Sequence, residues 1–325
     1  MQLEIIEQSW PIAGVFRISR GSRTETKVIQ VKLTDGTAVG RGECVPYARY
    51  DETLASVAQQ IEDIRPALEA GLSREQLSKM LPAGAARNAV DCALWDLECK
   101  RSGQSIWQLL DVPPKALTTA YTLSLDEPEN MKQKALEHKL RPLFKLKLAG
   151  AGDLERVQAV RNGAPNARII IDANEGWTKE IYQQLVPELV KLGVEMIEQP
   201  LPQAEDHILA ELEHPIALCA DESCHDRKDL ANLKGRYEMI NIKIDKTGGL
   251  TEALALKQAA VEAGFGIMVG CMVGTSLAMA PAFALAQDAK IVDLDGPLLL
   301  AKDQGEGFTY TAQSQMQPMT AELWG

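Results

Sequence analysis

Three carboxylic acids end three apolar segments in the middle of the sequence. Asp172 ends the run RIIID, Glu198 ends VEMIE and Asp221 ends ALCAD, with intervals of 26 residues (172 to 198) and 23 residues (198 to 221). One strand and one helix fit each interval, and the carboxyl ends of successive parallel strands meet at one edge of a sheet or barrel. We therefore expect the three carboxylates to converge.

Converging anions are stable only when a cation or shared protons neutralise them. The set contains no His or Cys, and oxygen ligands alone favour Mg²⁺, with Mn²⁺ as a substitute. Each carboxylate could instead cap the helix that follows its strand, which is a common use of Asp. Three such residues in a row, each ending an apolar strand, favour the magnesium site.

Lysines occur on the neighbouring segments on both sides of the acidic set. Lys145 and Lys147 are two residues apart, so on a strand they share a face, and two ammonium groups this close lower each other's pKa. Lys243 follows the apolar run MINI. In an eight-stranded barrel the second and sixth strands lie opposite each other, which predicts that Lys147 and Lys243 flank a bound substrate. The alternative is that these lysines are only solvent-exposed side chains at the ends of the strands.

This arrangement suits removal of a proton from a carbon next to a carboxylate. A bound cation stabilises the enediolate that forms, while one lysine takes the proton and the opposite lysine returns a proton to the other face. The stereocentre is then inverted. A barrel that binds a small anion without turnover is an alternative from another class, although binding alone needs no base on each face.

Residues 116–300 alternate short apolar segments with longer amphipathic ones, which is typical of repeated βα units. The predicted strands are Thr119–Leu123, Leu143–Leu148, Arg168–Asp172, Glu195–Glu198, Ile216–Asp221, Met239–Lys243, Ile267–Gly270 and Lys290–Leu294. Eight βα steps favour a barrel. A doubly wound open sheet would normally carry a glycine-rich phosphate loop after its first strand, and none is found here.

Residues 1–115 follow a different pattern, with strands first and helices afterwards, as in an α+β domain. The predicted strands are Leu3–Ile6, Val15–Ile18 and Val28–Leu33, with a turn at Asp35-Gly36, and the predicted helices are Thr53–Ala70 and Ala85–Lys100. Residues 301–325 cannot continue the barrel. We expect them to pack back on the N-terminal domain.

Composition excludes several classes of partner. A net charge of -11 and a pI near 5.0 argue against nucleic acid and anionic membranes. The N-terminus shows no secretory pattern, so a cytoplasmic location is expected. The uncharged stretch 263–287 is long enough to span a bilayer, but its glycines and Pro281 divide it into a buried strand and helix. Six scattered cysteines indicate buried thiols, and Cys219, Cys224 and His225 lack the second pair that zinc needs.

Five short motifs carry a resemblance to a known family. They are Lys145–Lys147, Ile171–Asn174, Ile197–Pro200, Ala220–Ser223 and Asn241–Lys243, the last followed by Lys246-Thr247-Gly248-Gly249. Together they resemble the muconate-lactonizing subgroup of the enolase superfamily, and residues 82–97 are similar to a helix of its interdomain region. The resemblance implies a modified (β/α)7β barrel with an α+β capping domain. It also implies Asp172, Glu198 and Asp221 as ligands of one Mg²⁺ per subunit, Lys147 and Lys243 as the acid/base pair, and Lys145 as a supporting lysine.

Within the subgroup the chain resembles the bacterial dipeptide epimerases that act on Ala-Glu. In those enzymes an arginine at the position of Arg23 meets the side-chain carboxylate of Glu, as bidentate guanidinium binding allows. Asp293 and Asp295 form an acidic pair at the end of the eighth strand, where the free ammonium of the N-terminal Ala fits. Thr122 and Tyr50 could also line the pocket, although a packing role explains each of them equally well.

Other reactions of the superfamily use related motifs. Racemisation of N-acylamino acids and formation of o-succinylbenzoate stay open as alternatives, although neither substrate offers an ammonium group to the acidic pair. The resemblance implies a role in peptidoglycan recycling. The sequence leaves the oligomeric state open, and a homo-oligomer is compatible with it.

Overall fold

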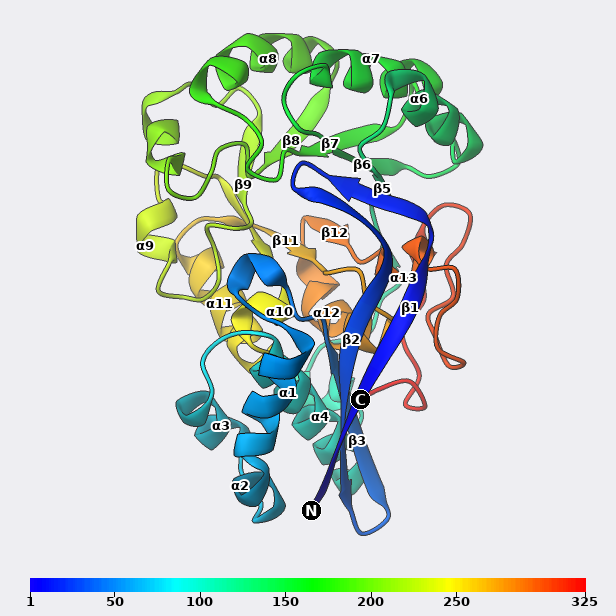
Figure 1. Cartoon of the computed structure of the whole chain (residues 1–325), viewed down its shortest axis with the longest axis vertical. Helices are drawn as coiled ribbons and strands as arrows, with labels where there is room; N and C mark the ends of the chain where they lie inside the picture. Colours follow the sequence, from blue (N-terminus) through cyan, green and yellow to red (C-terminus); the bar gives the residue numbers. More distant parts are fainter.

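Three long antiparallel strands begin the chain and form the sheet of an N-terminal cap domain (Figure 1). They are β1 (Gln2–Ile18), β2 (Gly21–Asp35) and β3 (Ala38–Cys44). The computed structural model describes all 325 residues. The expected runs at 3–6 and 15–18 are two ends of the single strand β1, whose pairing with β2 shifts register between Pro11 and Phe16. The turn expected at Asp35-Gly36 joins β2 to β3.

Helices of the cap pack against this sheet. They are η1 (Ala48–Tyr50), α1 (Leu54–Asp63), α2 (Arg65–Glu69), α3 (Arg74–Met80), α4 (Ala85–Ser102) and α5 (Ile106–Leu110). The single helix expected over 53–70 is divided, because Pro66 lacks the N–H that a continuous helix requires and lies instead in the first turn of α2. Gly40 and Gly42 let α4 lie directly on β3: an added Cβ would come within 2.2 Å of Ala93 O and 2.1 Å of Ala89 O.

Eight parallel strands form the second domain, a nearly closed barrel, which confirms the predicted fold. In chain order they are β5 (Tyr121–Leu123), β6 (Leu143–Lys147), β7 (Arg168–Asp172), β8 (Val194–Glu198), β9 (Ala217–Ala220), β10 (Met239–Ile242), β11 (Gly266–Gly270) and β12 (Ile291–Asp293). The first and last strands meet through Ala120 N, which donates to Val292 O at 2.8 Å.

Helical segments cover the outside of the barrel (Figure 1). They are α6 (Pro128–Glu137), α7 (Asp153–Gly163), α8 (Lys179–Lys191), η2 (Asp206–Glu211), α9 (Leu230–Leu233), α10 (Ile244–Thr247), α11 (Leu250–Glu262), α12 (Ser276–Leu285), η3 (Ala286–Asp288) and α13 (Gly296–Leu299). The uncharged stretch 263–287 forms β11 and the buried helix α12, and no helix is both long and apolar enough to cross a membrane.

The C-terminal residues return to helix α4 of the cap. Trp324 is fully buried and its Nε1 donates to Cys92 O at 3.1 Å, while Gly325 N donates to Asp96 Oδ1 at 2.8 Å. Earlier in the tail, β13 (Gln315–Met316) pairs with the short strand β4 (Leu117–Thr118) ahead of the barrel. The tail therefore contacts both domains. All six cysteines are free thiols.

Candidate active site

The barrel interior is closed at one end by a layer of side chains to which every strand contributes one residue. The layer consists of Ala120, Leu143, Ile170, Met196, Cys219, Met239, Met268 and Ile291. Side chains two residues apart on a strand share a face, so the next inward layer is fixed by counting two residues further along each segment. That layer consists of Thr122, Lys145, Asp172, Glu198, Asp221, Asn241, Gly270 and Asp293. The apolar layer thus supports a polar layer at the carboxyl end of the barrel.

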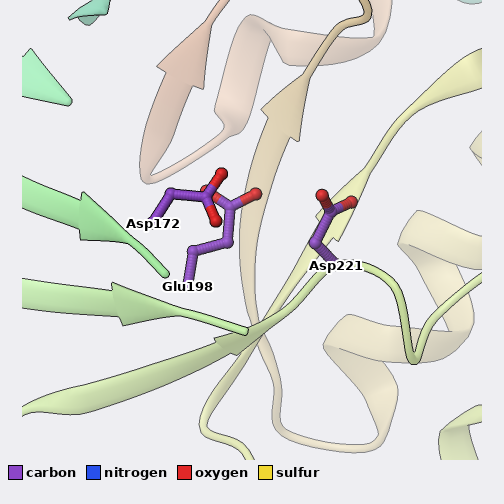
Figure 2. Close-up of side chains that lie close together, drawn as sticks. All are labelled: Asp172, Glu198 and Asp221. Atoms are coloured by element: carbon purple, nitrogen blue, oxygen red, sulfur yellow. The ribbon is translucent and has the colours of Figure 1, made fainter. Parts of the chain in front are cut away.

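The three carboxylates of this polar layer converge, as the strand spacing predicts. Figure 2 shows Asp172, Glu198 and Asp221 directed toward one region, and one oxygen from each lies within 4.8 Å of the others. All three side chains are buried. A set of three buried carboxylate oxygens at this separation fits a hard divalent cation, and the chain has no other group of His, Cys, Asp and Glu side chains with this geometry.

Lysines surround the carboxylates. Lys147 Nζ lies 2.6 Å from Asp172 Oδ2, and Lys243 Nζ lies 2.6 Å from Asp221 Oδ2. Lys145 Nζ lies 2.6 Å from Glu198 and 3.4 Å from Asp172. These ion pairs hold the carboxylates and the lysines in one compact cluster.

The pKa shifts of the carboxyl groups follow from these neighbours. Burial opposes ionisation of Asp172 and Asp221, but Lys147 lowers the pKa of Asp172, and Lys243 and Lys246 hold the pKa of Asp221 well below its usual value. Burial, with the charge of Asp172 added, raises the pKa of Glu198 to about 7.

The pKa of Lys145 is not lowered in the way expected from its spacing. Burial disfavours the charge on Lys145, but the carboxylates of Asp293, Glu198 and Asp172 outweigh it and raise the pKa of this lysine well above its usual value. The expectation considered only the charge of the neighbouring lysine and not the combined charge of these three carboxylates.

Amide side chains orient the carboxylates, and sequence reasoning missed these roles although the residues stand in the quoted motifs. Asn174 donates to Asp172 through both its backbone N and its Nδ2, at 2.9 and 3.1 Å. Asn241 Nδ2 donates to Glu198 Oε1 at 2.7 Å. Gly270 leaves room for that amide, since a Cβ there would lie 2.6 Å from Asn241 Oδ1.

A further residue that the sequence reasoning left unassigned, Lys246, is fully buried beside Asp221. Its Nζ donates to Asp221 Oδ1 at 2.7 Å and to Asn241 O at 3.0 Å. Gln199 accepts hydrogen bonds from the backbone N of Asp221 and Ser223, at 3.0 and 3.2 Å. These contacts fix the end of β9, from which Asp221 projects.

A cavity of about 400 Å³ lies over the cluster, between the barrel and the cap. Lys147 and Lys243 both line it, from β6 and the end of β10, with three strands between them in the barrel. Tyr50 also lines it, and its ring packs edge-on against His225 at 4.8 Å between centroids. The cap therefore completes the wall above the lysines.

The β1–β2 hairpin of the cap reaches over the barrel mouth. Arg20, at its turn, lies 2.7 Å from Glu222 and 3.2 Å from Glu175, and its Nη1 donates to Asn174 O at 2.7 Å. Arg49 binds the same Glu175 with two hydrogen bonds, at 2.9 and 3.0 Å. These ion pairs attach the cap to the loops that follow β7 and β9.

Arg23 lines the cavity from the same hairpin but has no ion pair or side-chain hydrogen bond. It belongs to strand β2, where it is paired with Phe16 of β1. Desolvation lowers the pKa of its guanidinium. A partly buried cation without an anionic partner, facing a cavity, is suited to bind the carboxylate of a ligand.

The acidic pair at the eighth strand has partners within the protein. Asp293 Oδ2 accepts from Lys145 Nζ at 2.7 Å, and Asp295 Oδ2 accepts from the backbone N of Thr122 at 2.6 Å. Burial and the charge of Asp293 raise the pKa of Asp295 to about 7. Asp293, Asp295 and Thr122 do not line the cavity, which reaches only Cys271, a neighbour of the two carboxylates. Their role in binding a substrate ammonium stays a prediction.

A larger groove of about 1040 Å³ lies elsewhere between cap and barrel. Its arginines Arg74 and Arg227 are paired with Glu98 and Glu252, and the lysines and the carboxylate triad do not line it. The smaller cavity, which Lys147, Asp221 and Lys243 line, is therefore the candidate active site.

Family models match most of the chain. Residues 1–111 match the mandelate racemase/muconate lactonizing enzyme N-terminal domain, and residues 130–303 match the enolase C-terminal domain-like model. The chain is 47% identical to an L-Ala-D/L-Glu epimerase of Escherichia coli, over 95% of the chain and 97% of that protein. It is 46% identical to an N-acetyl-D-glutamate racemase of a Pseudoalteromonas species, over 92% of the chain and 95% of that protein.

Solved structures of a dipeptide epimerase and of a homologue of such enzymes are also similar to the chain. An enolase family member from Agrobacterium tumefaciens, described as having homology to dipeptide epimerases and solved with sodium and L-Ala-L-Glu, superposes with a TM-score of 0.98 at 51% identity, covering 99% of both chains. A dipeptide epimerase from Enterococcus faecalis, solved with Mg and L-Leu-L-Tyr, superposes with a TM-score of 0.92 at 29% identity, covering 99% and 98% of the two chains.

Proposed function

Because the chain belongs to the mandelate racemase/muconate lactonizing enzyme family of the enolase superfamily, we propose that it is an epimerase that inverts the α-carbon of the Glu residue in Ala-Glu dipeptides. One observation carries the proposal: a single cavity holds Lys147 and Lys243, from opposite sides of the barrel, together with the unpaired guanidinium of Arg23. A base on each side is what inversion requires, and a free guanidinium suits a substrate with a second carboxylate.

Asp172, Glu198 and Asp221 are the proposed ligands of one Mg²⁺ ion, with Mn²⁺ as a substitute. Their convergence, their burial and the absence of nitrogen or sulfur ligands support this choice. When bound, the ion supplies positive charge that stabilises the negative charge developing on the substrate carboxylate.

The lysines carry out the proton transfers in this proposal. Lys147 takes the α-proton of one isomer while Lys243 delivers a proton to the opposite face, and the two exchange roles in the reverse direction. Lys145, held between Glu198 and Asp293, adds a fixed positive charge beside the acidic cluster.

Substrate selection is assigned to two places. Arg23 would bind the side-chain carboxylate of Glu, and Asp295 would bind the ammonium of the N-terminal Ala, with Tyr50 and Thr122 nearby. Tyr50 lines the cavity. Asp295 would bind the ammonium through the carboxylate oxygen that does not accept from Thr122 N.

A second candidate reaction is racemisation of N-acetylglutamate. The 46% identical relative of that name favours it, and the substrate offers the same Glu carboxylate to Arg23 without an ammonium for Asp295. A role in recycling peptides of the bacterial cell wall, in the cytoplasm, is proposed on the family resemblance alone.

The test is incubation of the purified protein with L-Ala-L-Glu and Mg²⁺ in D2O, with the Glu α-proton followed by NMR. We expect loss of the α-proton signal and appearance of L-Ala-D-Glu. If no deuterium enters the α-carbon of either dipeptide isomer, the epimerase proposal is excluded. Parallel incubation with N-acetyl-D-glutamate distinguishes the two candidate reactions. The second candidate predicts turnover of that compound and not of the dipeptide.

A further inference from the structure

The turn that follows Lys243 fixes the backbone of this lysine. Helix α10 is a single turn that starts immediately after it, and Lys243 O accepts hydrogen bonds from Lys246 N at 3.0 Å and from Thr247 N at 3.1 Å. A displacement of α10 would therefore displace Lys243.

Asp245 attaches this turn to the cap domain. The residue is buried, and its Oδ1 accepts hydrogen bonds from Val45 N at 3.0 Å and from Asn88 Nδ2 at 2.8 Å. Val45 follows strand β3 and Asn88 belongs to helix α4, so both donors come from the cap. Asn88 Nδ2 also donates to Glu43 O at 3.3 Å, which places this amide between the cap sheet and the barrel.

The Gly248-Gly249 pair lets helix α4 lie close to the same turn. An added Cβ would come within 2.4 Å of Arg87 Nε at Gly248 and within 2.4 Å of Asp91 Oδ2 at Gly249. Arg87 Nη2 in turn donates to Thr247 O at 2.5 Å. Side chains of helix α4 thus contact the segment after Lys243 both at its backbone, through Arg87, and at the side chain of Asp245, through Asn88.

Lys147 is supported differently. The turn after its strand is held by Asp153, which accepts from Ala149 N at 3.1 Å and from Gly150 N at 2.6 Å, and which is itself fixed by Trp177 Nε1 at 2.8 Å. All of these residues belong to the barrel. The turn after Lys147 is therefore fixed within the barrel, whereas the turn after Lys243 is attached to the cap.

We propose that Asp245 is a positioning residue for Lys243, which makes the placement of this lysine, but not of Lys147, depend on the docking of the cap. The inference rests on the acid/base roles assigned under the proposed function. It predicts that damage to the Asp245 contact affects the two proton transfers unequally.

The rate of epimerisation cannot report this inequality, because the equilibrium constant between the two dipeptides ties the forward and reverse kcat/KM together. Exchange of the α-hydrogen with D2O, with configuration retained, can report it, since each isomer gives its proton to one lysine. Lys147→Ala and Lys243→Ala first identify the isomer that each lysine serves. If the wild-type protein exchanges neither isomer, the proposed function fails, whatever the role of Asp245.

The decisive variant is Asp245→Ala. We expect exchange from the isomer served by Lys243 to fall about tenfold or more, as misplacement of a base predicts, while exchange from the other isomer changes less than about twofold. Asp245→Asn keeps an oxygen that can accept both bonds and should restore most of the loss. Should Asp245→Ala fold poorly, Asn88→Ala removes one of the two donors and should give the same bias to a smaller extent.

Two variants serve as controls. Trp95→Phe removes a cap–barrel hydrogen bond to Thr251, beyond the glycine pair, and should affect exchange from both isomers equally. Asp153→Ala should reverse the bias and slow exchange from the isomer served by Lys147. Equal losses from both isomers in the Asp245→Ala and Asn88→Ala variants, or the same bias in Trp95→Phe, would overturn the proposal.

Discussion

The guanidinium of Arg23 lies 5.5 Å from the ring centroid of Phe16, its partner across the β1–β2 hairpin, and has no carboxylate partner in the protein. The same ring lies 6.0 Å from Lys147 Nζ. Phe16 therefore lies close both to the cation proposed to bind the substrate side chain and to one of the two bases.

Replacing Arg23 should weaken binding of acidic substrates selectively. For Arg23→Met we expect the KM for L-Ala-L-Glu to rise about 10- to 100-fold, the effect of losing one charge-assisted hydrogen-bonded pair, with kcat changed less. Steady-state kinetics with L-Ala-L-Leu as the second substrate should show no such rise. Arg17→Met, an exposed arginine of the same strand as Phe16, is the matched control. Equal losses on both dipeptides would remove Arg23 from carboxylate binding.

Asp295 should matter only to substrates that carry an ammonium group. For Asp295→Asn we expect kcat/KM for L-Ala-L-Glu to fall about tenfold or more relative to that for N-acetylglutamate, because an uncharged amide loses the attraction to a cation. The comparison within one variant cancels any general damage to the Thr122 contact. An identical loss on the two substrates would contradict the assignment.

Magnesium should stabilise the folded protein through the carboxylate triad. Addition of Mg²⁺ to chelator-treated protein should raise Tm, because the three ligands converge only in the folded state, and at about 100 times Kd the gain is about 2.7 kcal/mol. Glu198→Gln should abolish the rise in Tm. Glu195→Gln, an exposed residue on the same strand, should retain it. A metal-dependent Tm that survives Glu198→Gln would exclude this residue as a ligand.

Much of the barrel and of its polar layer could be predicted from the sequence. Each barrel strand places an apolar residue of the closing layer two positions before an inward-facing residue of the polar layer, as with Ile170 and Asp172 or Met196 and Glu198. This alternation is local, and βα units repeat at a regular interval, so the strand ends and the converging carboxylates follow from spacing alone.

Contacts between distant segments could not be predicted in this way. Ser19 and Arg20 bind Asn174 O across more than 150 residues, and no local pattern indicates that the tip of the cap hairpin meets that loop. For Lys145 the spacing places carboxylates at neighbouring strand ends, but only the structure shows that Asp293, Glu198 and Asp172 together reverse the pKa shift expected from its neighbour. The sequence predicts two short strands within 1–18 where the structure has the single strand β1, whose pairing with β2 over Gln2–Pro11 and Phe16–Ile18 cannot be inferred from a local apolar pattern.

Glu43 should make stability depend on pH. The side chain is buried at the cap–barrel boundary, where it accepts from Thr275 N and Thr275 Oγ1, and burial raises its pKa from 4.5 to about 7, with the charges of Asp245 and Asp303 adding to the shift. A raised pKa means that the folded state binds the proton more tightly. The contribution of Glu43 is therefore complete below about pH 4.5 and is lost as the pH rises through about 7.

Thermal unfolding of wild type and Glu43→Gln at a series of pH values checks this sign. The glutamine cannot ionise, so its Tm relative to wild type should improve by about 2–4 °C between about pH 5 and about pH 8. A difference in Tm that stays constant, or that moves against the glutamine as the pH rises, would show that the ionisation of Glu43 does not control this dependence.

The central claim is that Lys147 and Lys243 act from opposite faces of one substrate carbon, and α-hydrogen exchange in D2O tests it most directly. Both Lys147→Ala and Lys243→Ala should lose epimerisation, by roughly 10²- to 10⁴-fold. Each should still exchange the α-hydrogen of one dipeptide isomer, L-Ala-L-Glu in one variant and L-Ala-D-Glu in the other. Exchange that survives from the same isomer in both variants, or full epimerisation in either, would contradict the account.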